Sequence, residues 1–227
     1  MQTPDAMDLP FDDRFGMLVD AEVAVRDTRR LQGRLRSANL RQAAAIEDLD
    51  FRIPRGLNRT LLTKLATSAW VASHKNIIIE GPTGSGKSFM ACALAQKSCR
   101  DGYSAIYYRA PKLFHELSIA KATGKYSTLL ASISRKSLLV IDDFGLTVLT
   151  DEQRHDLLEI MEDRYERSST LVAAQLPIDN WHQAIGDPTI ADAILDRLVH
   201  NAYKIKINAK ESIRKGKSTT NDSSLEF

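Results

Sequence analysis

Apolar and polar residues follow two different periods along the chain. Beyond residue 75, short continuous apolar runs of strand length alternate with segments in which apolar residues return every three or four positions, as on one face of a helix. The predicted strands are Asn76–Glu80, Ser104–Arg109, Leu138–Asp142, Thr170–Ala174 and Tyr203–Ile207. The predicted helices are Lys87–Arg100, Pro111–Lys121, Asp151–Glu166 and Thr189–Asn201. This alternation is typical of a three-layer α/β domain with a mostly parallel, five-stranded sheet.

The residues before this domain have a different pattern. From Phe11 to about Ala45, apolar residues at near-helical spacing predict one helix, with acidic side chains gathered in its first part and arginines in its second. A polar stretch with Pro54 and Gly56 suits a linker, and a helix around Leu57–Ser73 follows. The predicted divisions are a helical N-terminal arm (1–50), a linker with a lead-in helix (51–75), the α/β core (76–214) and a disordered tail (215–227).

One turn between a predicted strand and a predicted helix carries a phosphate-binding pattern. The strand Asn76–Glu80 is followed by Gly-Pro-Thr-Gly-Ser-Gly-Lys-Ser, which fits G-x-x-x-x-G-K-[ST]. Glycines let backbone N–H groups surround phosphate oxygens, and the N-terminus of the following helix adds its positive end. We expect Lys87 to reach the β- and γ-phosphates of ATP and Ser88 to hold Mg²⁺. The predicted nucleotide-binding residues are Gly81, Pro82, Thr83, Gly84, Ser85, Gly86, Lys87, Ser88 and Phe89.

A pair of carboxylates ends the third predicted strand. Asp142 is expected to share the Mg²⁺ with Ser88, and Asp143 is expected to orient or deprotonate the attacking water. Two acids at this place could instead cap the following turn or helix. Gln175 follows the fourth strand and is a candidate sensor of the γ-phosphate, although it could equally be a turn residue.

Charge modifies this picture only locally. Lys and Arg number 31 against 29 Asp and Glu, a net charge of +2, which excludes a chain that is basic throughout. Arg26, Arg30 and Arg34 recur every four residues and line one helix face, with Arg41 near the same row. Such a row suits sequence-independent contact with the phosphates of double-stranded DNA. The same run could be an ordinary solvated face. The apolar runs fall far short of the roughly 20 residues that span a bilayer, so we expect a cytoplasmic location and no membrane partner.

Several stretches, taken together, resemble one known family. The segment from Phe11 to Lys215 is similar to the IstB-like helper ATPases of insertion sequences, relatives of the DnaC/DnaI helicase loaders within the AAA+ superfamily. The matching stretches are Ala21-Glu22, Pro54-Arg55-Gly56-Leu57, the phosphate loop, Arg109-Ala110-Pro111, Asp142-Asp143-Phe144-Gly145, Asp163-Arg164-Tyr165, Gln175-Leu176-Pro177, Trp181-His182 and the block from Ile185 to Leu198. That last block is long and distinguishes this family from other phosphate-loop ATPases.

The resemblance implies a P-loop NTPase of the AAA+ type with a small helical N-terminal region, shortened here, and no C-terminal helical lid. It implies an ATPase, slow without DNA or a partner, that forms an ATP-dependent oligomer on double-stranded DNA and stimulates a DDE transposase. Arg197 matches the arginine finger that serves a neighbouring subunit, although a surface ion pair with Asp196 is the alternative. Arg214 matches a second sensor arginine, or belongs to a solvated basic tail.

Two other functions stay open from the sequence. One is a replicative helicase loader of the DnaC/DnaI kind, and the other is a nucleotide switch that does not hydrolyse ATP. The block from Asp187 to Leu198 favours the transposition helper over the loader. Asp143 stands where many related ATPases carry Glu, and its side chain is one methylene shorter, so we expect slow intrinsic hydrolysis.

Overall fold

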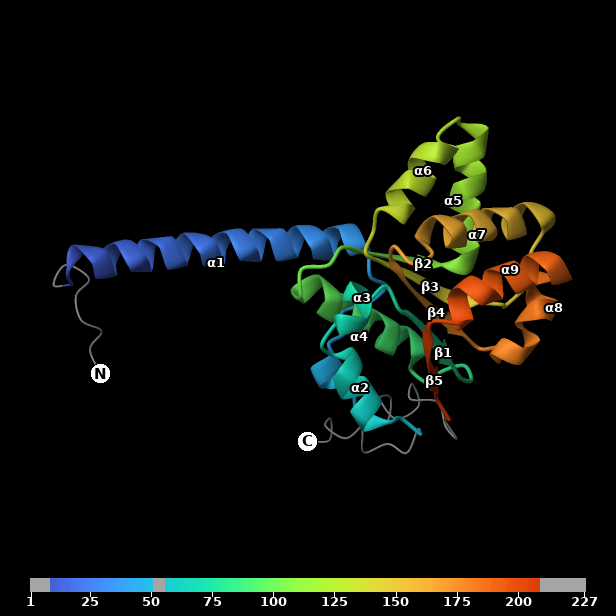
Figure 1. Cartoon of the computed structure of the whole chain (residues 1–227), viewed down its shortest axis with the longest axis horizontal. Helices are drawn as coiled ribbons and strands as arrows, with labels where there is room; N and C mark the ends of the chain where they lie inside the picture. Colours follow the sequence, from blue (N-terminus) through green and yellow to red (C-terminus); the bar gives the residue numbers. More distant parts are fainter. Residues whose placement is uncertain (1–8, 51–55, 209–227) are drawn as a thin grey trace, which may run out of the picture.

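Five parallel strands form the central sheet of the chain, in a computed structural model that describes residues 9–50 and 56–208 (Figure 1). Their order across the sheet is β2-β3-β4-β1-β5, and every neighbouring pair is parallel. The strands are β1 (Asn76–Glu80), β2 (Ala105–Arg109), β3 (Leu138–Phe144), β4 (Ser169–Ala174) and β5 (Ala202–Lys206). The predicted sheet is confirmed, with each strand boundary within two residues of its predicted position.

Helices cover both faces of the sheet, which makes three layers. Alternate strand residues point to opposite faces, so Ile77 and Ile79 pack in one core cluster with α4 (Lys87–Arg100), while Ile78 packs in another. The helices of the second face are α5 (Ala110–Ala122), α6 (Tyr126–Ser134), α7 (Asp151–Arg164), α8 (Trp181–Ile185) and α9 (Pro188–Val199), with the 3-10 turn η3 (Ile178–Asn180) before α8. The four predicted core helices are confirmed, whereas α6 was not predicted.

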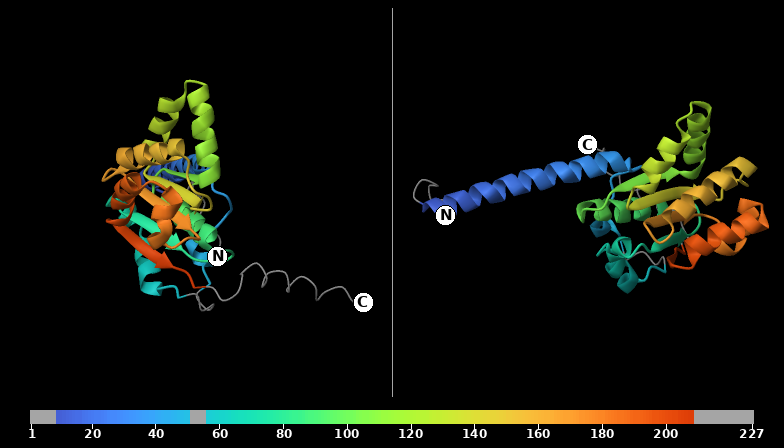
Figure 2. Two further views of the ribbon diagram at one scale, coloured as in Figure 1. Left: turned by 90° about the vertical axis from the view of Figure 1, so that its right-hand side faces the viewer. Right: turned by 45° about the horizontal axis from the view of Figure 1, so that its top comes forward.

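The N-terminal helix α1 (Phe11–Ala38) projects from the α/β body (Figures 1 and 2). Only its C-terminal end is anchored, where Leu31 and Leu35 pack on the α4 side of the sheet and Ala38 is fully buried. The apolar residues of its free part are exposed, among them Phe15 and Leu18. The near-helical spacing therefore predicted the helix, but only part of its apolar face packs on the core.

Two predictions about the N-terminal region are wrong in detail. Helix α1 ends at Ala38 rather than near residue 45, because Asn39 adopts a left-handed conformation (φ +49°) that stops the helix. The expected helix over Leu57–Ser73 is two helices, α2 (Arg59–Leu65) and α3 (Ala69–Ala72). They are separated because Ser68, at the junction, also has a left-handed backbone (φ +53°).

A short 3-10 helix, η2 (Ile46–Asp48), completes the described elements before the sheet. The description ends at residue 208, two residues after β5, and within it no helical lid follows the sheet. Arg214 and the tail 215–227 lie outside the described residues. Among the described helices, none is long and apolar enough to cross a membrane.

Candidate nucleotide-binding site

The phosphate loop connects β1 to α4 in a conformation that favours glycine at two positions, Gly81 and Gly86. A Cβ atom added to Gly81 would lie 2.6 Å from the carbonyl oxygen of Ile207, so this residue has no room for a side chain. Gly86 precedes α4 with a left-handed backbone (φ +96°), which glycine adopts without strain. The loop therefore presents the free N–H groups of a 14-residue helix to any anion bound there.

One buried hydroxyl in the loop shows that the residues fit a phosphate group. Ser85 is fully buried, and its Oγ has no hydrogen-bond partner among the described residues. Unpaired buried polar atoms are costly and rare in native structures. An oxygen of a bound triphosphate would supply the missing partner.

Lys87 is held against its own loop in this structure. Its Nζ atom donates hydrogen bonds to the carbonyl oxygens of Gly81 (2.6 Å) and Pro82 (2.9 Å). Burial lowers the pKa of the Lys87 ammonium, while the charges of Asp142 and Asp143 oppose that shift. The lysine is therefore already inside the loop, between the carbonyl oxygens on one side and the carboxylates on the other.

Asp142 is the buried acid of the site, with 1% of its surface exposed. Its Oδ2 accepts a hydrogen bond from the hydroxyl of Tyr107 at 2.6 Å, and its Oδ1 accepts one from the backbone N–H of Asp143 at 2.9 Å. Burial and the neighbouring Asp142 raise the pKa of Tyr107 well above its usual range, so the phenol stays protonated and donates. Mg²⁺ in phosphate sites takes one or two protein oxygens and completes its shell with phosphate and water, which suits Asp142 together with Ser88.

Asp143 has a strained backbone that depends on its surroundings. Its φ is +57°, which is unfavourable for a residue with a side chain. The strand pairing explains this conformation, because Ile141 lies opposite Val172 while Phe144 lies opposite Ala174, so β3 contains one extra residue here. The bulge turns the Asp143 carboxylate out of the ladder at the edge where the phosphate loop lies.

Two arginines contact these carboxylates. Sequence analysis assigned Arg109 no role, and it placed Arg41 only near the row of arginines that suits DNA contact. Arg109, at the end of β2, donates from Nε to Asp143 Oδ2 at 2.7 Å. Arg41, in the segment after α1, places a guanidinium nitrogen 3.6 Å from Asp142 Oδ2 and 3.6 Å from Asp143 Oδ2. Arg109 could have been found, because adjacent parallel strands end at the same edge and Arg109 is the register partner of Asp142. No pattern in the sequence around Arg41 indicates that it contacts Asp142 and Asp143, which lie about 100 residues further along the chain.

Gln175 lies beside the phosphate loop, as its strand-end position predicts. Its Oε1 accepts a hydrogen bond from the hydroxyl of Thr83 at 2.7 Å. The neighbouring strand residue Glu80 binds the backbone N–H of Ile178 at 2.8 Å, which fixes the chain just after Gln175. The structure thus gathers the loop, the two carboxylates and Gln175 at the carboxyl edge of the sheet.

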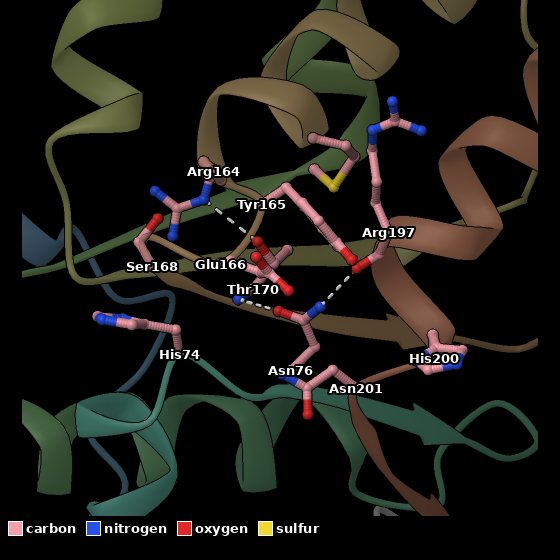
Figure 3. A pocket seen from close by; sticks show the side chains of 11 residues that line it. His74, Asn76, Arg164, Tyr165, Glu166, Ser168, Thr170, Arg197, His200 and Asn201 are labelled. Atoms are coloured by element: carbon pink, nitrogen blue, oxygen red, sulfur yellow. Dashed lines mark hydrogen bonds between the residues drawn. The ribbon is translucent and has the colours of Figure 1, made fainter.

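Arg197 lies at the opposite edge. The side chain of Asn76, the first residue of β1, donates to the carbonyl oxygens of Arg197 (3.0 Å) and Leu198 (3.1 Å), whereas the phosphate loop follows the last residue of β1. At about 3.3 Å per residue, the length of β1 alone separates the phosphate loop from the Asn76 end of the strand, where Arg197 lies, by roughly 13 Å. Figure 3 shows Arg197 at the rim of a pocket at this amino edge, with its side chain extending away from β1.

The side chain of Arg197 is bound within its own subunit. It donates to the carbonyl oxygen of Ala193 and, from Nη2, to Glu162 Oε1, both at 2.8 Å. The ion pair considered from the sequence, with Asp196, is therefore replaced by one with Glu162 on α7. This pair is partly exposed, with 27% and 53% of the two side chains accessible, so it restrains the guanidinium only weakly.

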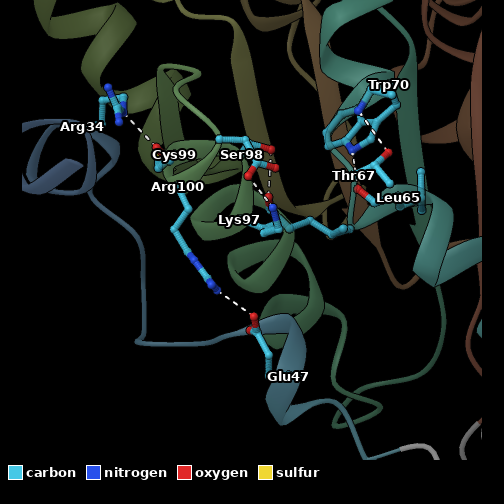
Figure 4. A network of polar contacts seen from close by, with 12 residues as sticks. Arg34, Glu47, Leu65, Thr67, Trp70, Lys97, Ser98, Cys99 and Arg100 are labelled. Carbon is cyan, nitrogen blue, oxygen red and sulfur yellow. Dashed lines mark hydrogen bonds and ion pairs between the residues drawn. The ribbon is translucent and has the colours of Figure 1, made fainter. Parts of the chain in front are cut away.

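The arginine row of α1 is already engaged in contacts within the chain. Arg26 pairs with Glu22 at 2.6 Å and Arg30 with Asp27 at 3.5 Å, both in exposed pairs along the helix. Arg34 instead donates from Nε to the carbonyl oxygen of Cys99 at 2.8 Å and ties α1 to the end of α4 (Figure 4). Arg26 and Arg30 remain exposed to solvent, whereas Arg34 has a structural contact that the sequence did not predict.

Replacing Tyr107 by Phe tests how much the buried carboxylate depends on its hydroxyl donor. Tyr107→Phe keeps the ring but removes the 2.6 Å hydrogen bond to Asp142. Because a buried charged acceptor loses a partner, we expect the free energy of unfolding to fall by about 1–3 kcal/mol. Equilibrium urea unfolding without nucleotide measures the change. A difference below about 0.5 kcal/mol would show that Asp142 is satisfied without Tyr107, and Tyr103→Phe, outside the site, is the matched control.

Comparison with known proteins agrees with this geometry. A family model described as IstB-like ATP binding protein matches residues 1–221. An insertion sequence ATP-binding protein of Sinorhizobium fredii is 50% identical over 200 residues, which cover 88% of this chain and 81% of that protein. One from Pseudomonas fluorescens is 42% identical over 175 residues, covering 77% and 76% of the two chains.

Solved structures share the fold at low sequence identity. The crystal structure of DnaI superimposes with a TM-score of 0.61 at 22% identity, over 75% of this chain and 89% of that one. The DnaC helicase loader gives a TM-score of 0.59 at 18% identity, over 73% and 97%. The P-loop NTPase fold of these loaders is thus confirmed for this chain. With the family match spanning nearly all of its length, the chain belongs to the IstB-like ATP-binding proteins of insertion sequences.

Proposed function

We propose that this protein is a cytoplasmic, Mg²⁺-dependent ATPase that helps transposition. In this proposal it assembles in an ATP-dependent manner on double-stranded target DNA, without sequence preference, and stimulates a DDE transposase. Membership of an insertion-sequence ATP-binding family supports the context. The fold shared with DnaI and DnaC keeps a helicase loader as the second candidate.

The observation that carries the proposal is the separation of the phosphate loop and Arg197 on opposite edges of the sheet. Lys87, Asp142, Asp143 and Gln175 lie at the carboxyl edge, while Arg197 lies beside the first residue of β1. An arginine at that distance cannot reach the nucleotide of its own subunit. In a ring or filament of copies, one subunit's amino edge can face the next subunit's loop, and this arrangement makes hydrolysis depend on assembly.

Each residue then has a physical task. The loop N–H groups and Lys87 bind the phosphates, and Lys87 exchanges the carbonyl oxygens of Gly81 and Pro82 for phosphate oxygens. Ser88 and Asp142 would hold Mg²⁺, which would supply positive charge beside the phosphates. Asp143 accepts the proton of the attacking water or orients that water, and Arg197 of a neighbouring copy neutralises charge developing on the transferred phosphoryl group.

The basic half of α1 supplies the DNA contact in this proposal. Arg26 and Arg30 are exposed and bonded only to acids of their own helix, so phosphates can replace Glu22 and Asp27 as partners. Contacts of this kind position DNA without reading bases. They also predict an affinity that falls steeply as salt rises from about 50 to about 200 mM.

ATP turnover measured with and without duplex DNA tests the proposed function. Wild-type protein is expected to turn over ATP slowly alone and faster with DNA of unrelated sequences, and the stimulation should disappear at high salt. Lys87→Ala removes the phosphate-binding ammonium and is the control for contaminating activity. If wild-type turnover never exceeds that of Lys87→Ala under any of these conditions, the protein is a switch that does not hydrolyse ATP.

A second measurement separates the transposition helper from the helicase loader. Purified protein is tested for binding to a transposase encoded beside its gene and, in parallel, to a replicative helicase of the same host. The proposal expects ATP-dependent binding of the transposase and none of the helicase. Binding of the helicase alone would establish the loader.

A further inference from the structure

The segment that follows α1 leads from the projecting helix directly to the catalytic carboxylates. Asn39 ends the helix, and the chain then crosses α4, where Ala44 is buried. Burial raises the pKa of the Cys92 thiol on α4, and the backbone N–H groups of Gln42 and Arg41 oppose that shift because they point at its sulfur. These contacts hold residues 41–44 against the body. Arg41 is only three residues beyond Ala38, the last residue of α1.

Within this segment, the side chain of Arg41 reaches the two carboxylates at the end of β3. It lies 3.6 Å from one oxygen of Asp142 and 3.6 Å from one oxygen of Asp143, so a single guanidinium bridges both acids. Burial alone would lower the pKa of Arg41, but Tyr107 and the two carboxylates outweigh it and raise the pKa. The Arg41 side chain is still 38% exposed, so it can leave without opening the core.

The same carboxylates are the ones to which the proposed function assigns the metal ion and the attacking water. Asp142 Oδ2 already accepts a hydrogen bond from Tyr107, and Asp143 Oδ2 accepts one from Arg109, so Arg41 adds a further cation to oxygens that already have donors. A divalent cation at Asp142 would lie close to the Arg41 guanidinium, and like charges at such short range repel strongly in a partly buried site. Arg41 and Mg²⁺ therefore compete for the acids.

We propose that Arg41 is a positioning residue through which α1 controls the catalytic carboxylates. While Arg41 bridges Asp142 and Asp143, Mg²⁺ binds weakly and Asp143 is not free to hold water. Because α1 is anchored only near its end, a partner that binds its free part and shifts residues 35–38 withdraws Arg41 from the acids. This inference rests on the proposed function, since it names how DNA bound to α1 stimulates hydrolysis at the same site.

The test compares Arg41→Ala with Arg36→Ala, which removes the same charge from an exposed position in the last turn of α1. Affinity for a fluorescent, non-hydrolysable ATP analogue is measured with Mg²⁺ and with a chelator instead. We expect the gain in affinity on adding Mg²⁺ to be at least about threefold larger in Arg41→Ala than in wild type, the size expected for a partly exposed ion pair. Arg36→Ala should match wild type.

Turnover gives the second readout. Arg41→Ala should hydrolyse ATP faster than wild type without DNA and should gain less from DNA, because the Arg41 bridge between the two acids is already absent. Arg41→Gln, which retains hydrogen bonding without charge, serves if the alanine variant folds poorly. An unchanged or smaller Mg²⁺ gain in both variants would overturn the inference. If no form hydrolyses ATP, the proposed function fails, and the Mg²⁺ comparison still decides the role of Arg41.

Discussion

Arg197→Ala is expected to lower DNA-stimulated ATP turnover by about 10³-fold while ATP affinity stays within about twofold of wild type. Arginines supplied to a phosphoryl-transfer site are worth about 10³–10⁵ in rate, and Arg197 lies too far from its own loop to affect binding there. Its loss breaks only a partly exposed ion pair with Glu162, so the fold should survive. Single-turnover hydrolysis and equilibrium nucleotide binding measure the two quantities.

Mixing two inactive variants tests whether Arg197 acts between subunits. Lys87→Ala retains the arginine but lacks the phosphate-binding lysine, and Arg197→Ala has the reverse defect. When the two are mixed, some interfaces combine an intact loop with an intact arginine, so turnover should recover part of the wild-type rate. Asp196→Ala, an exposed neighbour on the same helix, is the control and should behave as wild type. Failure to recover on mixing, or equal turnover in Arg197→Ala and wild type, would contradict a role between subunits.

The sequence predicts the loop and its two flanking elements with the right boundaries for a physical reason. The run Asn76–Glu80 is apolar and bounded by glycine, and Lys87–Arg100 is helical in period, so local signals agree with the tertiary structure. The positions of Asp142 and Gln175 follow equally from strand ends at one sheet edge. These features need no knowledge of distant contacts.

The remainder depends on contacts between distant residues. The left-handed Asn39 ends α1 although the periodicity continues into the alanines after it, and the alanines on either side, Ala38 and Ala44, are buried against the body. The bulge at Asp143 is set by pairing with β4, and the bridge from Arg41 joins parts of the chain that no local pattern relates. Periodicity detects amphipathic helices but does not say which residues cover them, so it could not show that the free part of α1 is exposed.

Arg164 carries the largest expected effect on stability. It is 2% exposed at the end of α7, and burial lowers its pKa to about 9, so it is still protonated at neutral pH. No carboxylate pairs with it among the described residues. Its guanidinium instead donates to the hydroxyl of Thr170 and to the carbonyl oxygens of Ile133, Lys136 and Ser169. One side chain thus joins the end of α6, the start of β3 and the start of β4.

Arg164→Met is expected to lower the free energy of unfolding by about 3–5 kcal/mol. Methionine fills much of the same space, so the loss comes from four hydrogen bonds whose buried acceptors lose a charged donor, each worth about 1 kcal/mol or more. Equilibrium urea unfolding measures it, with the exposed Arg167→Met as the matched control. A loss below about 1 kcal/mol would mean that water replaces the guanidinium. The expected loss is large against a total stability of about 5–15 kcal/mol, because Arg164 ties α7 to the end of α6 and to the starts of β3 and β4.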